Sequence, residues 1–291
     1  MSIHLDFDKM PLTGWYPGHM LKAGREMHGR LELVDMIIEL LDARAPRTSR
    51  NPALEAACGG KPRLLVFNKS DLADPAMTKR WQESLTRDGV ISLFVDGRTG
   101  SNVSRLPALA NEAWDAERKR RGATRPMLRE IRLMVAGLPN IGKSTLVNRL
   151  ALRHKAAVGP KPGVTRSTQW IKLQNGMELL DTPGVFWPRL ARKQDELVLG
   201  LCGCIKDDVI GEELMVEYIW YRFSRGKTPA RWNLYGLDHA PESPEAFLDA
   251  AGRRRGLLLP GGIPDRHQAA IAVINDFRDG RLGRITFDEP E

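Results

Sequence analysis

Cysteine is scarce in this chain, and long hydrophobic runs are absent. The 291 residues include three cysteines, Cys58, Cys202 and Cys204, with no C-x-x-C pair and no histidine at zinc-finger spacing. The sequence therefore predicts small buried thiols rather than a disulfide framework or a structural zinc. No apolar run approaches the roughly 18 residues that cross a bilayer, and MSIHLDFDKM at the N-terminus lacks the features of a secretory signal. We expect a cytoplasmic protein with no membrane partner.

Positive charge is in excess, and it is unevenly placed along the chain. The net charge is +8, and residues 1–204 carry 32 Lys and Arg against 21 Asp and Glu, whereas residues 205–291 carry 12 against 15. The most basic stretches are RKRRGATRP at 118–126 and the interval 149–177, which has six Lys or Arg and no carboxylate. Such patches indicate a polyanionic partner, although a charge run can also be an ordinary solvated face.

Short apolar runs alternate with helical patterns in the first part of the chain. Strands are predicted from apolar runs at 34–44, 63–69, 131–137 and 177–181. Helices are predicted from amphipathic patterns at 19–32, 77–87, 104–120 and 143–152. This alternation predicts an α/β fold, a doubly wound and mostly parallel sheet, as a domain of residues 1–204.

Residues 205–291 show helical spacing throughout, and we expect a small all-α domain there. Ser243 and Asp265 have the residue types and positions of helix N-caps. Gly252 and Gly280 are placed to end the helices that follow these caps.

GLPNIGKST at 137–145 matches the phosphate-binding pattern G-x-x-x-x-G-K-[ST], with an apolar strand before it and an amphipathic helix after it. Glycines let backbone N–H groups wrap a β-phosphate, and the helix N-terminus adds positive potential. Lys143 is predicted to bridge the β- and γ-phosphates in catalysis, and the Ser144 hydroxyl to bind Mg²⁺. The nucleotide-binding residues predicted in this loop are Asn140, Ile141, Gly142, Lys143, Ser144 and Thr145.

MELLDTPG at 177–184 supplies a second part of a nucleotide site. Asp181 ends a predicted strand, where it can hold Mg²⁺ through water, and Gly184 can offer its backbone N–H to the γ-phosphate. The intervening KPGVTRST should supply a catalytic threonine that reaches both Mg²⁺ and the γ-phosphate. Thr165 is the predicted residue, and Thr168 is the alternative.

FNKSD at 67–71 contains the guanine-reading pattern N-K-x-D. The Asp71 carboxylate presents two acceptors that match the N1–H and N2–H₂ donors of guanine and repel the N1 lone pair of adenine. Asn68 would contact the N7 side of the purine, and the stem of Lys69 would cover the ring face. A third base-contacting loop is expected after one more strand, at Asp96 and Gly97, where GTPases usually have Ser-Ala.

The base loop precedes the phosphate loop, which reverses the usual order. This order predicts a circularly permuted P-loop GTPase, because permutation is tolerated where native termini lie close together at the surface. The segment that senses the γ-phosphate is then followed directly by the helical domain, so its ordering on GTP binding would bias that domain's pose.

Stretches along nearly the whole chain resemble the ribosome biogenesis GTPase A (YlqF) family of circularly permuted GTPases. They are WYPGHMLKAGREM, LLDARAPRTSRNP, NKSDL, GLPNIGKSTLVNRL, KPGVTRSTQW, DTPGVFWP, LGLCGCIKD and FRDGRLGRITFDEP. The resemblance implies GTP and GDP as ligands, and a GTPase that binds the maturing large ribosomal subunit and its rRNA late in assembly. Hydrolysis to GDP and phosphate, slow without the ribosomal particle, would drive release.

The resemblance also bears on catalysis and on further cofactors. Val185 stands where many GTPases have a water-orienting glutamine, and the resemblance nominates His19 of PGHM to position water instead. Asn140 matches the asparagine that binds K⁺ in K⁺-activated GTPases, so K⁺ is an expected cofactor beside Mg²⁺.

Several alternatives remain open from the sequence. One is a GTP-dependent RNA-binding or tRNA-modification factor without a role in ribosome assembly, and another is a P-loop ATPase or small-molecule kinase. We expect a monomer whose C-terminal domain contacts RNA, with Arg278, Arg281 and Arg284 placed either to contact phosphates or to cap a helix end.

Overall fold

The computed structural model describes residues 7–14, 29–122, 129–153, 170–173, 176–180, 190–226 and 229–291. These residues form two compact units. The α/β unit comprises the described residues within 16–71, 78–188 and 288–291. The helical unit comprises those within 1–15, 72–77 and 189–287, whereas the sequence places a single boundary after residue 204.

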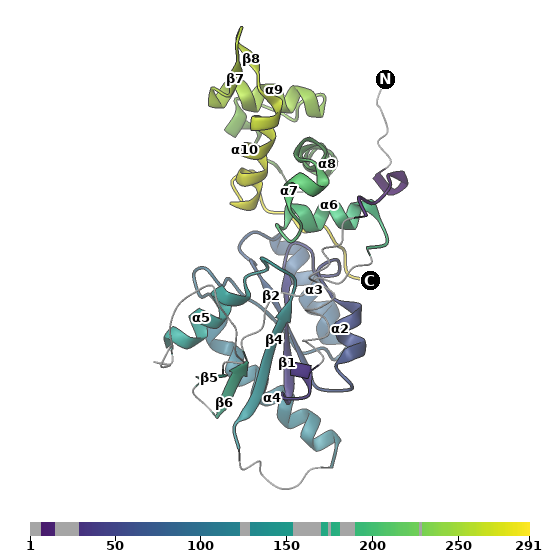
Figure 1. Ribbon diagram of the computed structural model, residues 1–291, viewed down its shortest axis with the longest axis vertical. Helices are drawn as coiled ribbons and strands as arrows, with labels where there is room; N and C mark the ends of the chain where they lie inside the picture. The colour runs from purple at the N-terminus through teal and green to yellow at the C-terminus, as the bar shows by residue number, and fades with distance from the viewer. Residues whose placement is uncertain are drawn as a thin grey trace. The chain divides into compact units, whose positions relative to one another are not determined.

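A six-stranded sheet forms the centre of the α/β unit, in the order β3-β2-β1-β4-β6-β5 (Figure 1). Its strands are β1 (Met36–Asp42), β2 (Arg63–Asn68), β3 (Ser92–Phe94), β4 (Ile131–Gly137), β5 (Trp170–Leu173) and β6 (Met177–Leu180). All neighbours pair in parallel except β5, which runs antiparallel to β6 at one edge. The predicted mostly parallel sheet is therefore confirmed, and β5 is an edge strand that the sequence did not indicate.

The strand order explains how motifs that are separated in the sequence come together. β4 is the fourth strand along the chain, yet it lies beside β1 in the middle of the sheet. From this pair, β2 and β3 extend the sheet on one side, and β6 and β5 extend it on the other. Ligands of open α/β sheets bind at the carboxyl ends of strands where the order reverses, which here means the ends of β1 and β4.

Four helices belong wholly or partly to the α/β unit: α2 (Pro52–Ala57), α3 (Pro75–Arg87), α4 (Leu106–Arg120), which follows the short helix η2 (Val103–Arg105), and α5 (Lys143–Arg153). Leu54 of α2 and the adjoining Cys58 pack with Ile37, Met134 and Leu180 of the sheet. All five are almost completely buried. The strands are apolar because both faces of a parallel sheet are covered. With six residues, α2 is too short to show a clear helical period in the sequence.

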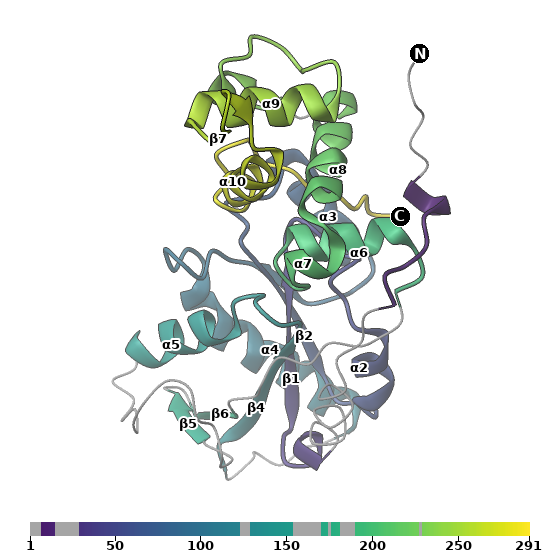
Figure 2. The same ribbon diagram turned by 45° about the horizontal axis from the view of Figure 1, so that its top comes forward.

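Aromatic side chains form part of the core of the helical unit. Its elements are η1 (Phe7–Lys9), α6 (Lys193–Leu201), α7 (Asp207–Ile210), α8 (Glu212–Arg225), η3 (Trp232–Tyr235), α9 (Pro244–Arg255), α10 (Arg266–Arg278) and the strands β7 (Leu258–Leu259) and β8 (Ile263–Pro264). Figure 2 shows the helices α6 to α10 of this unit. Phe223 of α8 packs edge-on against Trp232 and against Phe277 of α10. Trp232 packs in the same way against Phe247 of α9. Such pairs join helices that are distant in the sequence into one core.

The predicted N-caps of this unit are confirmed, and one predicted helix end is wrong. The Ser243 hydroxyl accepts from the N–H of Ala246, and the Asp265 carboxylate accepts from that of Gln268. α9 continues through Gly252 and ends at Gly256, which has φ 67°. Gly252 is buried, and a Cβ there would lie 3.0 Å from Pro264 Cβ, so this glycine serves close packing instead of helix termination.

The expectation of a purely α-helical domain needs a small correction, because β7 and β8 pair antiparallel as a hairpin. Within the part of the chain that the structure describes, no helix combines the length and the apolarity that crossing a membrane requires.

Candidate nucleotide site

Asn68, at the carboxyl end of β2, connects three loops of the predicted site. Its Nδ2 donates to the carbonyl of Ile141 in the phosphate loop at 2.9 Å. Its Oδ1 accepts from the N–H of Gly97 in the third loop at the same distance. The side chain is 3% exposed, so both hydrogen bonds are protected from water. The structure thus brings the base loop, the third loop and the phosphate loop to one place.

The phosphate loop lies between β4 and α5, and two of its glycines are required by close contacts. A Cβ on Gly137 would lie 2.4 Å from the carbonyl oxygen of Leu40 in the neighbouring β1. A Cβ on Gly142 would lie 2.2 Å from Nδ2 of Asn68, and Gly142 has φ 105°, which disfavours any other residue. The buried Lys143 turns its Nζ onto the carbonyls of Gly137 and Leu138, at 3.2 and 2.6 Å. Its ammonium group therefore lies inside the loop that is predicted to hold phosphates.

The third loop is held by its own carboxylate. Asp96 accepts from the N–H groups of Arg98 and Thr99, at 2.8 and 3.2 Å, and from the Thr99 hydroxyl at 2.6 Å. Burial alone would raise the pKa of Asp96, but these hydrogen bonds stabilise the carboxylate and lower it. Both carboxylate oxygens of Asp96 accept hydrogen bonds within the turn, so Asp96 stabilises the shape of this loop. The Gly97 N–H forms the hydrogen bond that connects the loop to Asn68.

The side chain of Lys69 is positioned by a buried carboxylate at the end of β1. Lys69 has φ 60°, and its Nζ lies 3.0 Å from Oδ2 of Asp42. Asp42 is fully buried and also accepts from Nε and Nη2 of Arg44 at 2.9 and 2.8 Å. Burial would raise the pKa of Asp42, but the two nearby cations hold it well below its usual range. Asp42 therefore stays ionised and fixes the lysine stem that is predicted to cover the base.

Asp71, the predicted guanine reader, is partly accessible. Its Oδ2 lies 3.4 Å from Nη2 of Arg98, a side chain that is 80% exposed. An exposed ion pair of this kind contributes little stability. The carboxylate can exchange this partner for the edge of a base.

Ser144 and Thr145 are exposed in the first turn of α5. In the described part of the chain, no cluster of three or more His, Cys, Asp or Glu could hold a metal ion. Mg²⁺ is commonly bound by one or two protein oxygens together with phosphates, and the hard, exposed hydroxyl of Ser144 fits that role. The other predicted site residues lie outside the described residues: His19, Thr165 with its alternative Thr168, Asp181 and Gly184. Val185 lies outside them as well.

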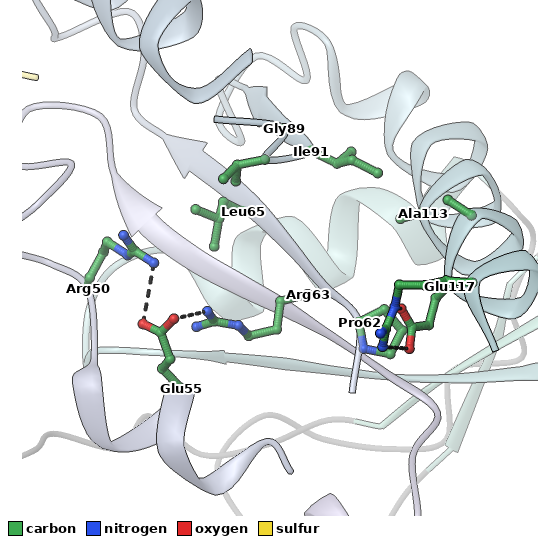
Figure 3. A pocket seen from close by; sticks show the side chains of 12 residues that line it. Arg50, Glu55, Pro62, Arg63, Leu65, Gly89, Ile91, Ala113 and Glu117 are labelled. Atoms are coloured by element: carbon green, nitrogen blue, oxygen red, sulfur yellow. Dashed lines mark hydrogen bonds and ion pairs between the residues drawn. The ribbon is translucent and has the colours of Figure 1, made fainter. Parts of the chain in front are cut away.

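A pocket of about 410 Å³ lies elsewhere in the α/β unit (Figure 3). Its lining includes Arg63, the first residue of β2, whereas Asn68 lies at the opposite end of that strand. Figure 3 shows Glu55 between the guanidinium groups of Arg50 and Arg63, at 3.5 and 2.6 Å. This pocket is thus separate from the three loops, and both of its lining carboxylates, Glu55 and Glu117, are paired with arginines.

Sequence reasoning missed residues that support the loops. The signal for Asp42 was its place in the sequence: it is an acidic residue in a predicted apolar strand, and the next predicted strand contains Asn68. Arg149 was assigned to a basic interval, yet its side chain donates to the carbonyls of Gly97 and Arg98 and holds the third loop against α5. In the RKRR patch, Arg120 and Arg121 both pair with Glu117, which reduces the charge available to a partner.

Comparison with known proteins is consistent with this geometry. Residues 132–210 match a family described as 50S ribosome-binding GTPase. The chain is 39% identical to ribosome biogenesis GTPase A of Bacillus pumilus over 95% of this chain and 98% of the relative. It is 33% identical to mitochondrial ribosome-associated GTPase 1 of Xenopus tropicalis, over 97% and 96%. The structure of GNP-bound YlqF from T. maritima superposes with a TM-score of 0.68 at 26% identity, covering 93% of this chain and 99% of that one.

The permuted sheet, the phosphate loop and these matches define a circularly permuted P-loop GTPase with a helical C-terminus. Within this class, the chain belongs to the ribosome biogenesis GTPase A family.

Proposed function

We propose that the protein, a cytoplasmic monomer, binds the maturing large ribosomal subunit and its rRNA in the GTP state and leaves after hydrolysis. The hydrogen bonds of Asn68 support the nucleotide part of this proposal. They join the base loop to the phosphate loop, which follow each other along the chain in the reverse of the usual order. The role in ribosome assembly rests on family membership. Relatives named for ribosome biogenesis or ribosome association favour this role over tRNA modification.

Each described loop has a part in nucleotide binding. Asp71 accepts from N1–H and N2–H₂ of guanine, and Lys69, held by Asp42, covers the ring face. Lys143 moves from the loop carbonyls to the β- and γ-phosphates when these arrive. Mg²⁺, when bound at Ser144, neutralises charge on the phosphate oxygens.

Hydrolysis requires a positioned water that attacks the γ-phosphorus as the bond to the GDP oxygen breaks. Val185 has no polar group for this purpose, and we assign water positioning to His19, which the resemblance to the family nominates. Thr165 would reach both Mg²⁺ and the γ-phosphate, Asp181 would hold Mg²⁺ through water, and Gly184 would offer its N–H to the γ-phosphate. The chain continues from residue 184 into the helical unit, so ordering of this segment by GTP biases that unit's pose.

Asn140 is proposed to bind K⁺, which would supply positive charge beside the phosphates. Asn140 has φ 55°, a backbone conformation that non-glycine residues adopt infrequently and that is consistent with a functional constraint. GTP turnover should be faster in K⁺ buffer than in Na⁺ buffer. Equal rates would remove K⁺ from the mechanism and leave the GTPase assignment intact.

The proposal is tested by sedimentation of the full-length protein with large-subunit precursors. We expect comigration with a non-hydrolysable GTP analogue and much weaker comigration with GDP. Asp71→Asn should lose both GTP binding and nucleotide-dependent comigration, since its amide presents a donor where guanine also donates. Comigration that ignores the nucleotide, or binding to tRNA in place of the particle, would contradict the proposal.

A further inference from the structure

The β7–β8 hairpin concentrates exposed apolar side chains. Leu258, Leu259 and Ile263 are 47%, 48% and 62% exposed. Among the described residues, the other exposed large apolar side chains are Leu12 and Leu33. Scattered surface leucines are ordinary, whereas three within six residues mark an interaction surface. In Figure 1 the hairpin projects beyond α9 as the yellow tip of the helical unit.

Backbone hydrogen bonds order the hairpin where it joins α9 and α10. The N–H of Leu257 donates to the carbonyl of Gly252 in α9, and the N–H of Asp265 donates to the carbonyl of Leu257, both at 2.9 Å. Pro264 packs closely against Gly252, where an added Cβ would lie 3.0 Å from Pro264 Cβ. Across the turn, the N–H of Gly262 donates to the carbonyl of Leu259 at 3.1 Å. The hairpin is therefore preorganised and presents its apolar residues without unfolding.

The hairpin is also the basic end of an acidic region. Residues 253–264 contain three arginines and no carboxylate, although residues 205–291 as a whole have more acidic than basic side chains. Arg253 and Arg254 are exposed in the last turn of α9, and neither forms an ion pair with any described residue. Arg255 differs, because its guanidinium binds the buried Asp276.

Two of the three arginines that the sequence nominated for RNA contact, Arg278 and Arg281, are engaged by carboxylates. Nη2 of Arg278 donates to Asp207 at 2.6 Å and to the carbonyl of Gly200 at 2.7 Å, so this side chain stabilises the unit internally. Arg281 pairs with Asp276 and Asp279. Arg284 is exposed and forms no ion pair with another described residue, so the unpaired positive charge of this region includes Arg284 as well as Arg253 and Arg254 beside the hairpin.

We propose that the end of α9 and the β7–β8 hairpin form an RNA-docking surface. Arg253 and Arg254 contact phosphates, and Leu258, Leu259 and Ile263 pack on the faces of exposed bases or sugars. RNA is favoured because guanidinium groups pair bidentately with phosphate, residues 253–264 themselves carry no carboxylate, and aliphatic side chains can insert between bases. This inference rests on the proposed function, since the RNA in question is that of the ribosomal particle.

The test compares two double variants of the full-length protein with wild type. Arg253→Gln with Arg254→Gln should weaken binding to large-subunit precursors and to protein-free rRNA about tenfold, and should reduce the salt dependence by about one to two phosphate contacts. Leu259→Ser with Ile263→Ser should weaken both without changing the salt dependence. Arg231→Gln, an exposed arginine outside the hairpin, is the matched control and should bind as wild type.

All variants should keep the wild-type melting temperature and GTP affinity, because the changed side chains are exposed. Wild-type affinity of both double variants for rRNA would overturn the inference. Weaker binding to particles with unchanged binding to protein-free rRNA would also overturn it, by assigning the hairpin to a protein partner. If wild type itself fails to bind particles, the proposed function fails, and the rRNA measurement still decides the role of the hairpin.

Discussion

Replacing Asp42 with asparagine removes one charge from the most deeply buried ionic cluster around the nucleotide loops. The variant keeps the size of the side chain and breaks the ion pair between Asp42 and the Arg44 guanidinium, which is 2% exposed. It also removes the anchor of Lys69, whose Nζ lies 3.0 Å from the carboxylate. Stability and nucleotide binding should therefore both fall.

The size of the effect follows from burial. Breaking a buried pair by removing one partner costs about 3–5 kcal/mol, since the remaining charge loses a close counter-charge in a medium of low dielectric. For a unit of this size, that corresponds to a fall in melting temperature of about 6–20 °C. GTP affinity should fall as well. Without its anchor, Lys69 would lose side-chain freedom only when the base binds, and this loss would reduce the free energy of binding.

Thermal and urea unfolding without nucleotide, followed by titration with a fluorescent guanine nucleotide, measure the two effects. The matched control is Asp249→Asn in the helical unit. Asp249 binds Arg266 at 2.7 Å in a similar bidentate pair, but the arginine is 45% exposed, so the loss should be about 0–1 kcal/mol. Equal small losses in both variants would refute the argument that burial decides the strength of the Asp42 cluster.

The same cluster predicts part of the acid sensitivity. The folded pKa of Asp42 is lowered, whereas its unfolded value is about 3.9. Its ionised form therefore contributes stability above pH of about 4, and this contribution is lost as pH falls toward the folded pKa. Asp42→Asn should lose stability less steeply than wild type when acidified below that pH. Parallel acid-unfolding curves, followed by circular dichroism, would contradict this linkage.

Three further predictions follow from single contacts. Gly142→Ala places Cβ 2.2 Å from Nδ2 of Asn68, on a residue with φ 105°. The resulting strain of about 1–3 kcal/mol should weaken GTP binding by about tenfold or more in a fluorescence titration. An unchanged Kd for GTP would show that the loop relaxes freely. Burial raises the pKa of Cys58 to about 11, so mass spectrometry should find it unalkylated by iodoacetamide at pH 8 in the folded protein and alkylated in urea. Asp276 is 1% exposed and accepts from the Tyr235 hydroxyl at 3.0 Å. Asp276→Ala should therefore destabilise the helical unit by about 1–3 kcal/mol or more. An unfolding curve of the variant that matches that of wild type would exclude a stabilising role.

Much of the architecture could be predicted because local chemistry sets it. The apolar runs that became β1, β2, β4 and β6 needed no tertiary information, since strands covered on both faces must be apolar along their length. The N-caps Ser243 and Asp265 were recognisable for the same reason, because each cap depends on a backbone N–H three residues away. β5 was not predicted, because a short edge strand derives its conformation from pairing with β6.

By itself, the sequence predicted which residues carry the nucleotide chemistry, because G-x-x-x-x-G-K-S and N-K-x-D specify side chains and backbone freedom within a few positions. Only the tertiary structure decided which distant groups hold those residues in place. Asp42 acts on Lys69, and Arg149 acts on the third loop, because the order of strands brings separate segments to one edge of the sheet. The tertiary structure also distinguished arginines that look alike in the sequence. Arg278 donates hydrogen bonds to carbonyl and carboxylate groups of the helical unit, whereas Arg253 and Arg254 are exposed to water. Hydrogen bonds and burial depend on distances through space, and spacing along the chain does not specify those distances.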